Sequence, residues 1–249
     1  MTITRKTQIF AHRGANREAA ENTRGAFDLA LQADINGLET DVQLSRDEIA
    51  VLFHDDDFHR IGLPDKRVSD FTFTELQTLD LATLCKLATP FSTAMRLDDF
   101  VPRYRSRTRL LLEIKNRDDE ARAPIETKVQ QTLAIVGAHQ GEQILLSSFH
   151  LDSLIYAHQC ASNFPLVFNM EPEHTLEDVR HSLATQPFLH GYCVHINTLN
   201  HALVELLRSH NKLIAVYTCN SAAQIQTALG LQVDILISDV PKIALEMRS

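Results

Sequence analysis

Short apolar runs alternate with longer amphipathic segments along most of this chain. From about residue 108 onward, each run of four to six residues typical of a β-strand is followed by a segment with helical spacing. Strands buried on both faces read as continuous apolar runs, and right-handed crossovers place such strands parallel in one sheet. The pattern therefore predicts a series of β-α units.

Two further apolar runs near the N-terminus extend this series to eight strands. The expected strands cover residues 8–11, 37–44, 109–114, 143–147, 166–169, 192–195, 213–217 and 235–238. The expected helices cover residues 23–33, 124–138, 150–159, 176–184, 200–210, 221–229 and 240–247. At 249 residues the chain has the usual size of a (β/α)8 barrel of the TIM type, about 250 residues. We expect this α/β barrel, with an open doubly wound sheet as the alternative.

The interval 56–107 does not fit the repeat. It follows a short apolar run at 49–53, contains three of the eight prolines, and holds one expected helix at 74–79. We interpret it as a small insertion after the second strand, packed over the mouth of the barrel. Because no Gly/Ser-rich linker interrupts the chain, residues 1–249 are expected to form a single domain.

The composition and charge of the chain limit the kinds of molecule that it is expected to bind. Apolar residues make up 44% of the chain and charged residues 22%, with a formal net charge of -8. This charge argues against a nucleic acid partner, and it means that an anionic substrate needs a local cationic site. We see no signal peptide and no apolar stretch long enough for membrane insertion. The four cysteines are scattered, without a C-x-x-C pair, as is usual for reduced thiols. We therefore expect a cytoplasmic protein.

Acidic side chains lie within the second predicted strand and at the end of the third. Glu39 and Asp41 are two residues apart, so the pleat directs both to the same face, and Glu113 and Lys115 repeat this spacing. Active sites of barrels of this kind lie at the carboxyl ends of the strands. Three carboxylates converging there predict a divalent cation, and all-oxygen ligation favours Mg²⁺ or Ca²⁺ over zinc.

Two histidines accompany these carboxylates. His12 and Arg13 follow the first strand, and His54 follows the run at 49–53. A histidine titrates near neutral pH and can act as general acid or base, while an arginine can hold a phosphate. Taken alone, any one of these residues is more often an ordinary surface or core residue. Their joint position at strand ends favours an active site.

The same residues fall in an ordered set of motifs that resembles the glycerophosphodiester phosphodiesterase family. The motifs run nearly the whole length of the chain and are His12-Arg13-Gly14, Glu21-Asn22-Thr23, Gly37-x-Glu39-x-Asp41-Val42, Val51-x-x-His54-Asp55, Glu113-Ile114-Lys115, Ser147-Ser148-Phe149, Tyr217-Thr218-x-Asn220 and Asp234 through Ser238-Asp239-Val240-Pro241. The resemblance implies a β/α barrel that hydrolyses glycerophosphodiesters, small-molecule substrates, to sn-glycerol 3-phosphate and an alcohol with a divalent metal ion.

The resemblance also implies a role for each site residue. Glu39, Asp41 and Glu113 would bind the metal, His12 and His54 would be the acid/base pair, Arg13 and Lys115 would hold the phosphate, and Phe149 and Tyr217 would line the substrate pocket. Thr23 would cap the first helix. The chain departs from the family pattern at Ala20, where proline is usual, at Tyr217, where tryptophan is usual, and within 92–100. These departures leave the catalytic set intact but concern the alcohol side of the substrate.

Two other functions fit the same pattern. One is a phosphodiesterase of the lysophospholipase D type on the same barrel, which needs an apolar groove. The other is a non-catalytic barrel that binds a phosphorylated metabolite, although all three carboxylates and both histidines are present. The preferred alcohol, the choice of metal, the roles of the two histidines and the oligomeric state stay open at this point.

Overall fold

Eight parallel strands close into a barrel in the computed structural model, which describes residues 6–88, 90–117, 119–137 and 143–249. Around the ring the strands follow in the order β1 (Gln8–His12), β10 (Ile235–Ser238), β9 (Leu213–Tyr217), β8 (Gly191–His195), β7 (Leu166–Met170), β6 (Ile144–Ser148), β5 (Arg109–Ile114) and β2 (Gly37–Leu44). A pairing between β1 and β2 closes the ring. The predicted (β/α)8 barrel is confirmed, and the alternative of an open sheet is wrong.

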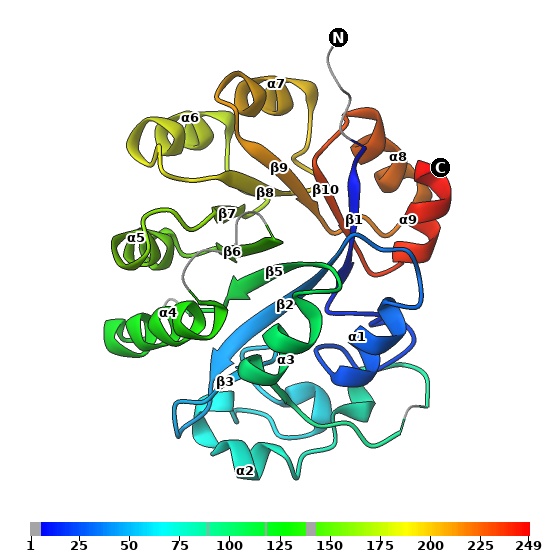
Figure 1. The fold of residues 1–249 in the computed structure, drawn as a ribbon, viewed down its shortest axis with the longest axis vertical. Coiled ribbons are helices and arrows are strands. Elements are labelled where there is room, and N and C mark those ends of the chain that lie inside the picture. Colours follow the sequence, from blue (N-terminus) through cyan, green and yellow to red (C-terminus); the bar gives the residue numbers. More distant parts are fainter. Residues whose placement is uncertain (1–5, 89, 118, 138–142) are drawn as a thin grey trace.

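Helices surround the strands on the outside of the barrel (Figure 1). They are α1 (Arg24–Ala30), α3 (Leu97–Tyr104), α4 (Arg122–Val136), α5 (Leu151–Cys160), α6 (Leu176–Thr185), α7 (His201–Ser209), α8 (Ala222–Gly230) and α9 (Pro241–Arg248). As expected, the Thr23 side chain caps α1 by accepting a hydrogen bond from the backbone N–H of Ala26. The last residue of the helix expected at 124–138, Ala138, lies outside the described residues.

The interior of the barrel is a packed apolar layer. Side chains that point inward from successive strands form one buried cluster, namely Phe10, Leu111, Leu145, Val167, Cys193, Ala215, Ile235 and Ile237. Phe10 fills the space beside β2, where a Cβ atom on Gly37 would lie 2.3 Å from the Phe10 ring. The barrel is therefore closed below the ends of its strands, and substrate can enter only at their carboxyl ends.

The segment between β2 and β5 contains a small unit beside the barrel. β3 (Ala50–Leu52) runs antiparallel to β2, and β4 (Met95–Arg96) runs antiparallel to β3. The helix α2 (Phe73–Leu76) covers the first three of the six residues expected to be helical at 74–79. In Figure 1 this unit lies below the barrel, around α2 and β3. Its apolar side chains, including Phe53 and Phe58, form a separate buried cluster.

α3 also falls within the interval 56–107 but packs with the barrel. Its Phe100 ring lies 4.6 Å from the ring of Phe27 on α1, measured between centroids, and 5.0 Å from that of Tyr104. All three side chains are fully buried. By its contacts α3 belongs to the layer of helices around the barrel, and the unit that departs from the repeat ends at β4.

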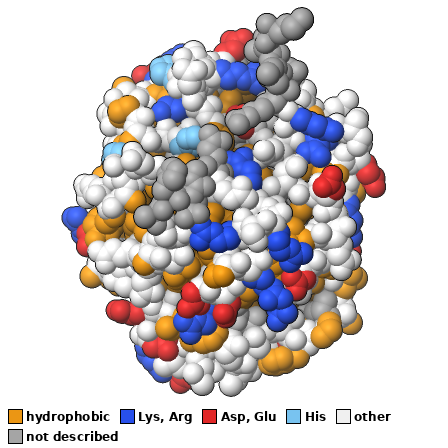
Figure 2. Space-filling model, viewed as in Figure 1, with side chains coloured by type: hydrophobic (Ala, Val, Ile, Leu, Met, Phe, Trp, Pro, Cys, Tyr) orange, Lys and Arg blue, Asp and Glu red, His pale blue; other side chains and the backbone are white. Residues whose placement is uncertain are grey.

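The face of the molecule seen in Figure 2 carries basic and acidic side chains interspersed with scattered apolar ones. Within the described residues, no helix is both long enough and apolar enough to cross a membrane.

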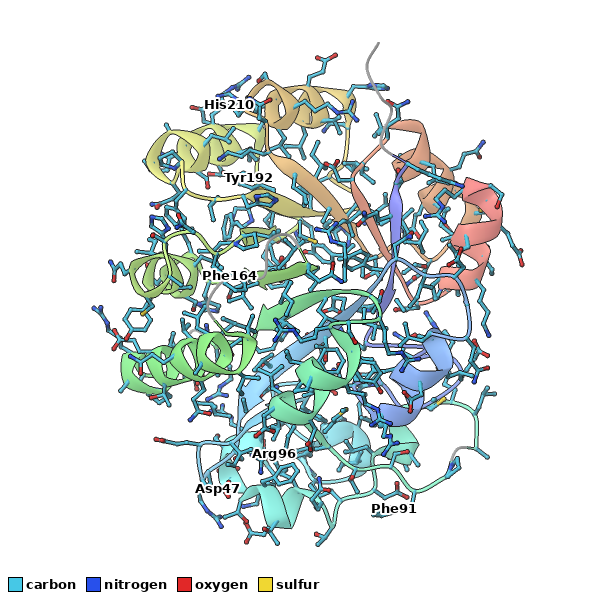
Figure 3. The ribbon with its side chains drawn as sticks, viewed as in Figure 1. Asp47, Phe91, Arg96, Phe164, Tyr192 and His210 are labelled. Carbon is cyan, nitrogen blue, oxygen red and sulfur yellow. The ribbon has the colours of Figure 1, made fainter. Side chains whose placement is uncertain are left out.

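Replacing Phe100 by alanine is expected to lower the free energy of unfolding by about 3–5 kcal/mol, because it opens a cavity among buried aromatic rings. Phe91 provides the matched control, since it is 63% exposed and lies at the outer edge of the molecule (Figure 3). Denaturant unfolding monitored by circular dichroism would measure both variants. Equal losses for Phe100→Ala and Phe91→Ala would contradict this account of the core.

Candidate active site

The polar groups of the site lie one pleat beyond the apolar layer of the barrel. Side chains on one face of a strand recur every second residue. His12 therefore follows Phe10 on the inward face of β1, and Glu113 follows Leu111 on that of β5. The same spacing applies to the polar side chains at the ends of β6, β7, β8 and β9, which are Ser147, Asn169, His195 and Tyr217. The change from apolar to polar within two residues marks the floor of the site.

Strand register brings the three predicted metal ligands together. Asp41 pairs with Glu113 across β2 and β5, and Glu39 pairs with His12 across β2 and β1. Ligand oxygens of Glu39, Asp41 and Glu113 lie within 4.8 Å of one another. Glu39 and Asp41 are buried, and only 12% of the Glu113 side chain is exposed. This arrangement can offer an oxygen ligand from each of three carboxylates to one ion.

Two cations compensate these carboxylates. The Lys115 ammonium lies 2.8 Å from an oxygen of Glu113 and 3.9 Å from one of Asp41. The Arg13 guanidinium lies 3.3 Å from an oxygen of Asp41 and donates to Glu21 at 3.0 Å. Lone buried carboxylates would be costly, so these ion pairs are needed for the site to fold.

The backbone of Arg13 has a left-handed conformation, with φ at 55°. A residue with a side chain rarely adopts this conformation. Here it directs the backbone N–H of Arg13 to a carboxylate oxygen of Glu39 at 3.1 Å, while the side chain reaches Glu21 and Asp41. Gly14 follows with φ at 82°, and a Cβ atom there would lie 2.7 Å from the carbonyl carbon of Ala26. The turn therefore requires glycine after the arginine.

The two carboxyl groups of β2, Glu39 and Asp41, have pKa values shifted in opposite directions. Burial, together with the negative charges of Asp41 and Glu113, raises the pKa of Glu39 well above its usual value. Burial also opposes ionisation of Asp41, but Arg13, His54 and Lys115 outweigh it and lower the pKa of that carboxyl. The charge and the backbone N–H of Arg13 favour the ionised form of Glu39, but they do not outweigh burial and the two neighbouring carboxylates. A bound divalent cation would further favour the ionised form, so the donor set fits Mg²⁺ or Ca²⁺.

Each histidine is held by its own aspartate. The Nδ1 atom of His12 lies 2.6 Å from Asp239, and the Nδ1 atom of His54 lies 2.8 Å from Asp55. Burial, and next the positive charge of Arg13, lower the pKa of His12. Hydrogen bonds from His54 and Arg60 overcome the effect of burial and lower the pKa of Asp55 to about 2. Both aspartates engage Nδ1, so Nε2 is the atom of each ring that can exchange a proton with a substrate, and Nε2 of His12 lies 3.8 Å from a carboxylate oxygen of Glu39.

A cavity of about 150 Å³ lies between these groups. It is lined by both histidines, both cations, two of the carboxylates, and Phe149 and Tyr217. The two aromatic rings meet edge to face with centroids 5.6 Å apart, and the Tyr217 hydroxyl donates to the backbone carbonyl of Met170 at 2.8 Å. A larger cleft of about 780 Å³ shares His54, Lys115 and both aromatic rings with this cavity. The smaller cavity can receive a phosphate group, and the larger cleft can receive the rest of a substrate.

All nine residues singled out in the sequence therefore lie in one place: eight line the cavity, and a carboxylate oxygen of Asp41 lies within 4.8 Å of those of Glu39 and Glu113. Sequence reasoning assigned no role to three amides and acids that hold them. Asn22 donates to Asp41 at 2.9 Å, Asn169 donates to Glu113 at 3.1 Å, and Asp239 holds His12. The two-residue alternation along the strand at 166–169 could have pointed to Asn169. The contact of Asp239 with His12 spans 227 positions of the sequence, and no local signal predicts it.

Comparison with known proteins agrees with this geometry. The model of the glycerophosphoryl diester phosphodiesterase family matches residues 12–243, so the chain belongs to this family. It is 29% identical to a glycerophosphodiester phosphodiesterase of Bacillus altitudinis, over 97% of this chain and 98% of that protein. The resemblance noted in the sequence is confirmed, and with it the enzyme class.

Solved structures show the same fold. A phosphodiesterase of Oleispira antarctica superposes with a TM-score of 0.83 at 24% identity, covering 96% of both chains. A glycerophosphodiester phosphodiesterase of Thermotoga maritima superposes with a TM-score of 0.77 at 23% identity, covering 97% of this chain and 98% of that one. These likenesses extend over the whole barrel.

Replacing Asp239 by asparagine is expected to lower kcat by about 10–100-fold, the usual effect of removing a group that orients a site residue. The uncharged amide no longer stabilises a proton on His12 and need not hold the same tautomer. Asp234→Asn is the matched control, because Asp234 lies before the other end of β10 and accepts from the backbone N–H of Ile214. Steady-state hydrolysis of a glycerophosphodiester would show the difference. Equal kcat values for the two variants would contradict a positioning role for Asp239.

Proposed function

We propose that this protein hydrolyses glycerophosphodiesters to sn-glycerol 3-phosphate and an alcohol, with a divalent metal ion and with His12 and His54 as acid and base. The observation that carries the proposal is the convergence of three carboxylates, two cations and two histidines on one small cavity. The Oleispira antarctica neighbour was solved in complex with sn-glycerol-3-phosphate, its product, which supports this choice of product.

Phosphate binding falls to the two cations. Arg13 and Lys115 line the cavity and can neutralise the charge of a phosphodiester as it develops in the transition state. Glu39, Asp41 and Glu113 would hold the metal ion, which as a Lewis acid would polarise a phosphoryl oxygen. The ion pairs already orient both cations before substrate arrives, so little reorganisation is needed on binding.

Proton transfer falls to the histidines. Both line the cavity, and each is anchored at Nδ1 by a carboxylate. One takes a proton from the nucleophile and the other protonates the departing alkoxide. The nucleophile is either water or the glycerol 2-hydroxyl of the substrate, which would pass through a cyclic phosphate. Full activity on a substrate that lacks the 2-hydroxyl would exclude the cyclic route.

The surroundings of the site favour a small polar substrate over a lysophospholipid. The larger cleft is lined by charged residues, among them Asp56, Arg67, Arg117, Asp119 and Glu171. An acyl chain would be poorly accommodated against these groups. We further propose that the protein acts in the cytoplasm without a nucleic acid partner, as its charge and cysteine content indicate.

Removing the metal ion is expected to abolish activity, and adding Mg²⁺ or Ca²⁺ is expected to restore it. Glu39→Gln should raise the metal concentration needed for half-maximal activity by more than about tenfold, since one of three anionic ligands is lost. Glu18→Gln is the control, because Glu18 pairs with Lys242 on the surface. The measurement is release of glycerol 3-phosphate from glycerophosphocholine and glycerophosphoethanolamine, with a lysophospholipid for comparison. Activity that survives a chelator would contradict a required metal ion, and turnover of the lysophospholipid alone would favour the lysophospholipase D alternative.

His12→Ala and His54→Ala are each expected to lower kcat by about 10²–10⁴-fold, because each removes a general acid or base. His210→Ala serves as the control, since His210 lies exposed at the end of α7, far out on the molecule (Figure 3). Retention of near wild-type turnover by both His12→Ala and His54→Ala would show that the mechanism is wrong.

A further inference from the structure

One arginine of the unit beside the barrel contacts the site from outside. Arg60 lies in a 3₁₀-helix (His59–Ile61) that follows His54 and Asp55. Its Nε atom lies 2.5 Å from an oxygen of Asp55, and its two terminal nitrogens donate to both oxygens of Glu21 at 2.6 and 3.2 Å. All three guanidinium nitrogens are thus engaged by two carboxylates. A lysine has no such planar fork and could not reproduce this arrangement.

These contacts extend in both directions to residues that line the cavity of the site. Glu21 accepts a hydrogen bond from Arg13 as well, and Asp55 holds Nδ1 of His54. The carboxylates are well shielded, with 10% of the Glu21 side chain and 23% of the Asp55 side chain exposed, while 40% of the Arg60 side chain is exposed. Arg60 therefore links the turn that carries the phosphate-binding arginine to the aspartate that orients the histidine.

Without the guanidinium, the same place would resemble a metal site. Ligand atoms of Glu21, His54 and Asp55 lie within 4.8 Å of one another. Two carboxylates and an imidazole at this spacing are a donor set that zinc accepts. An imidazole bound to a metal ion through Nδ1 keeps its Nε2 protonated near neutral pH, so it could not act as a base. In this structure, the positive charge between the two carboxylates is that of Arg60.

We propose that Arg60 is a positioning residue for His54 and that its guanidinium takes the place of a cation between Glu21 and Asp55. Arg60 fixes the position of Asp55, and Asp55 in turn orients the ring of His54. The positive charge of Arg60 also keeps metal ions away from His54. The unit between β2 and β4 thereby contributes to catalysis through a residue that need not touch substrate. This inference rests on the proposed role of His54 in the hydrolysis.

Arg60→Met is expected to lower kcat by about 10–100-fold with a smaller change in KM, because it disturbs the histidine rather than the phosphate-binding cations. Arg60→Lys should recover only part of kcat, since it restores the charge but not the fork. In a His54→Ala background, Arg60→Met should cost little more, because the two residues act as one unit. Arg46→Met is the matched control, as Arg46 pairs with Glu75 away from the site. Thermal unfolding would verify that each variant folds, and Arg60→Lys carries the test if Arg60→Met does not.

The inference on position is overturned if Arg60→Met matches Arg46→Met in kcat, or if its effect persists undiminished in the His54→Ala background. Zinc binding tests the other part of the proposal, that the Arg60 guanidinium replaces a metal ion, without an activity assay. Calorimetric titration with Zn²⁺ in saturating Mg²⁺ should reveal an additional site in Arg60→Met that is absent from wild type, from Arg60→Lys and from Arg60→Met/Asp55→Asn. No additional site would overturn the idea of a replaced cation. An inactive wild type with the zinc result as expected would instead count against the proposed function alone.

Discussion

Three carboxylates buried within reach of one another are the constraint on which the rest of this site depends. Burial and mutual repulsion both oppose their ionisation, and the raised pKa of Glu39 records this. Arg13 and Lys115 offset part of the repulsion, and the amides of Asn22 and Asn169 satisfy further oxygens. These groups do not fully offset the cost of ionising Glu39, and a divalent ion bound beside it would lower that cost. A stable fold and a reactive site therefore share the same groups.

The barrel makes this concentration of charge possible. Inward side chains alternate along each strand, so a packed apolar layer around Phe10 and Leu111 can lie one pleat below His12 and Glu113. The apolar layer excludes water from beneath the site, which strengthens every ion pair above it. The same closure leaves the carboxyl ends of the strands as the way in. Chemistry and core packing are thus separated by only two residues along a strand.

Both histidines follow one plan but are supported by different parts of the molecule. His12 is held by Asp239 from beyond the last strand of the ring, so closure of the barrel itself completes its environment. His54 is held by its neighbour Asp55, and Arg60 braces this pair from the unit beside the barrel. The departure from the β-α repeat therefore has a chemical consequence, since it supplies the arginine that a plain barrel connection would lack.

The sequence by itself determined the eight strands, the barrel, the family and the nine residues that meet at the site, because strand periodicity and ordered motifs are local signals. It placed Glu39 beside Asp41 and Glu113 beside Lys115 through their spacing alone. Only the tertiary structure decided that Asp239 contacts His12 and that Arg60 bridges Glu21 and Asp55. These contacts join parts of the chain with no periodic relation to one another. They form because ring closure and packing of the small unit bring unlike charges together in a place shielded from water. A short stretch of sequence carries no information about such long-range contacts.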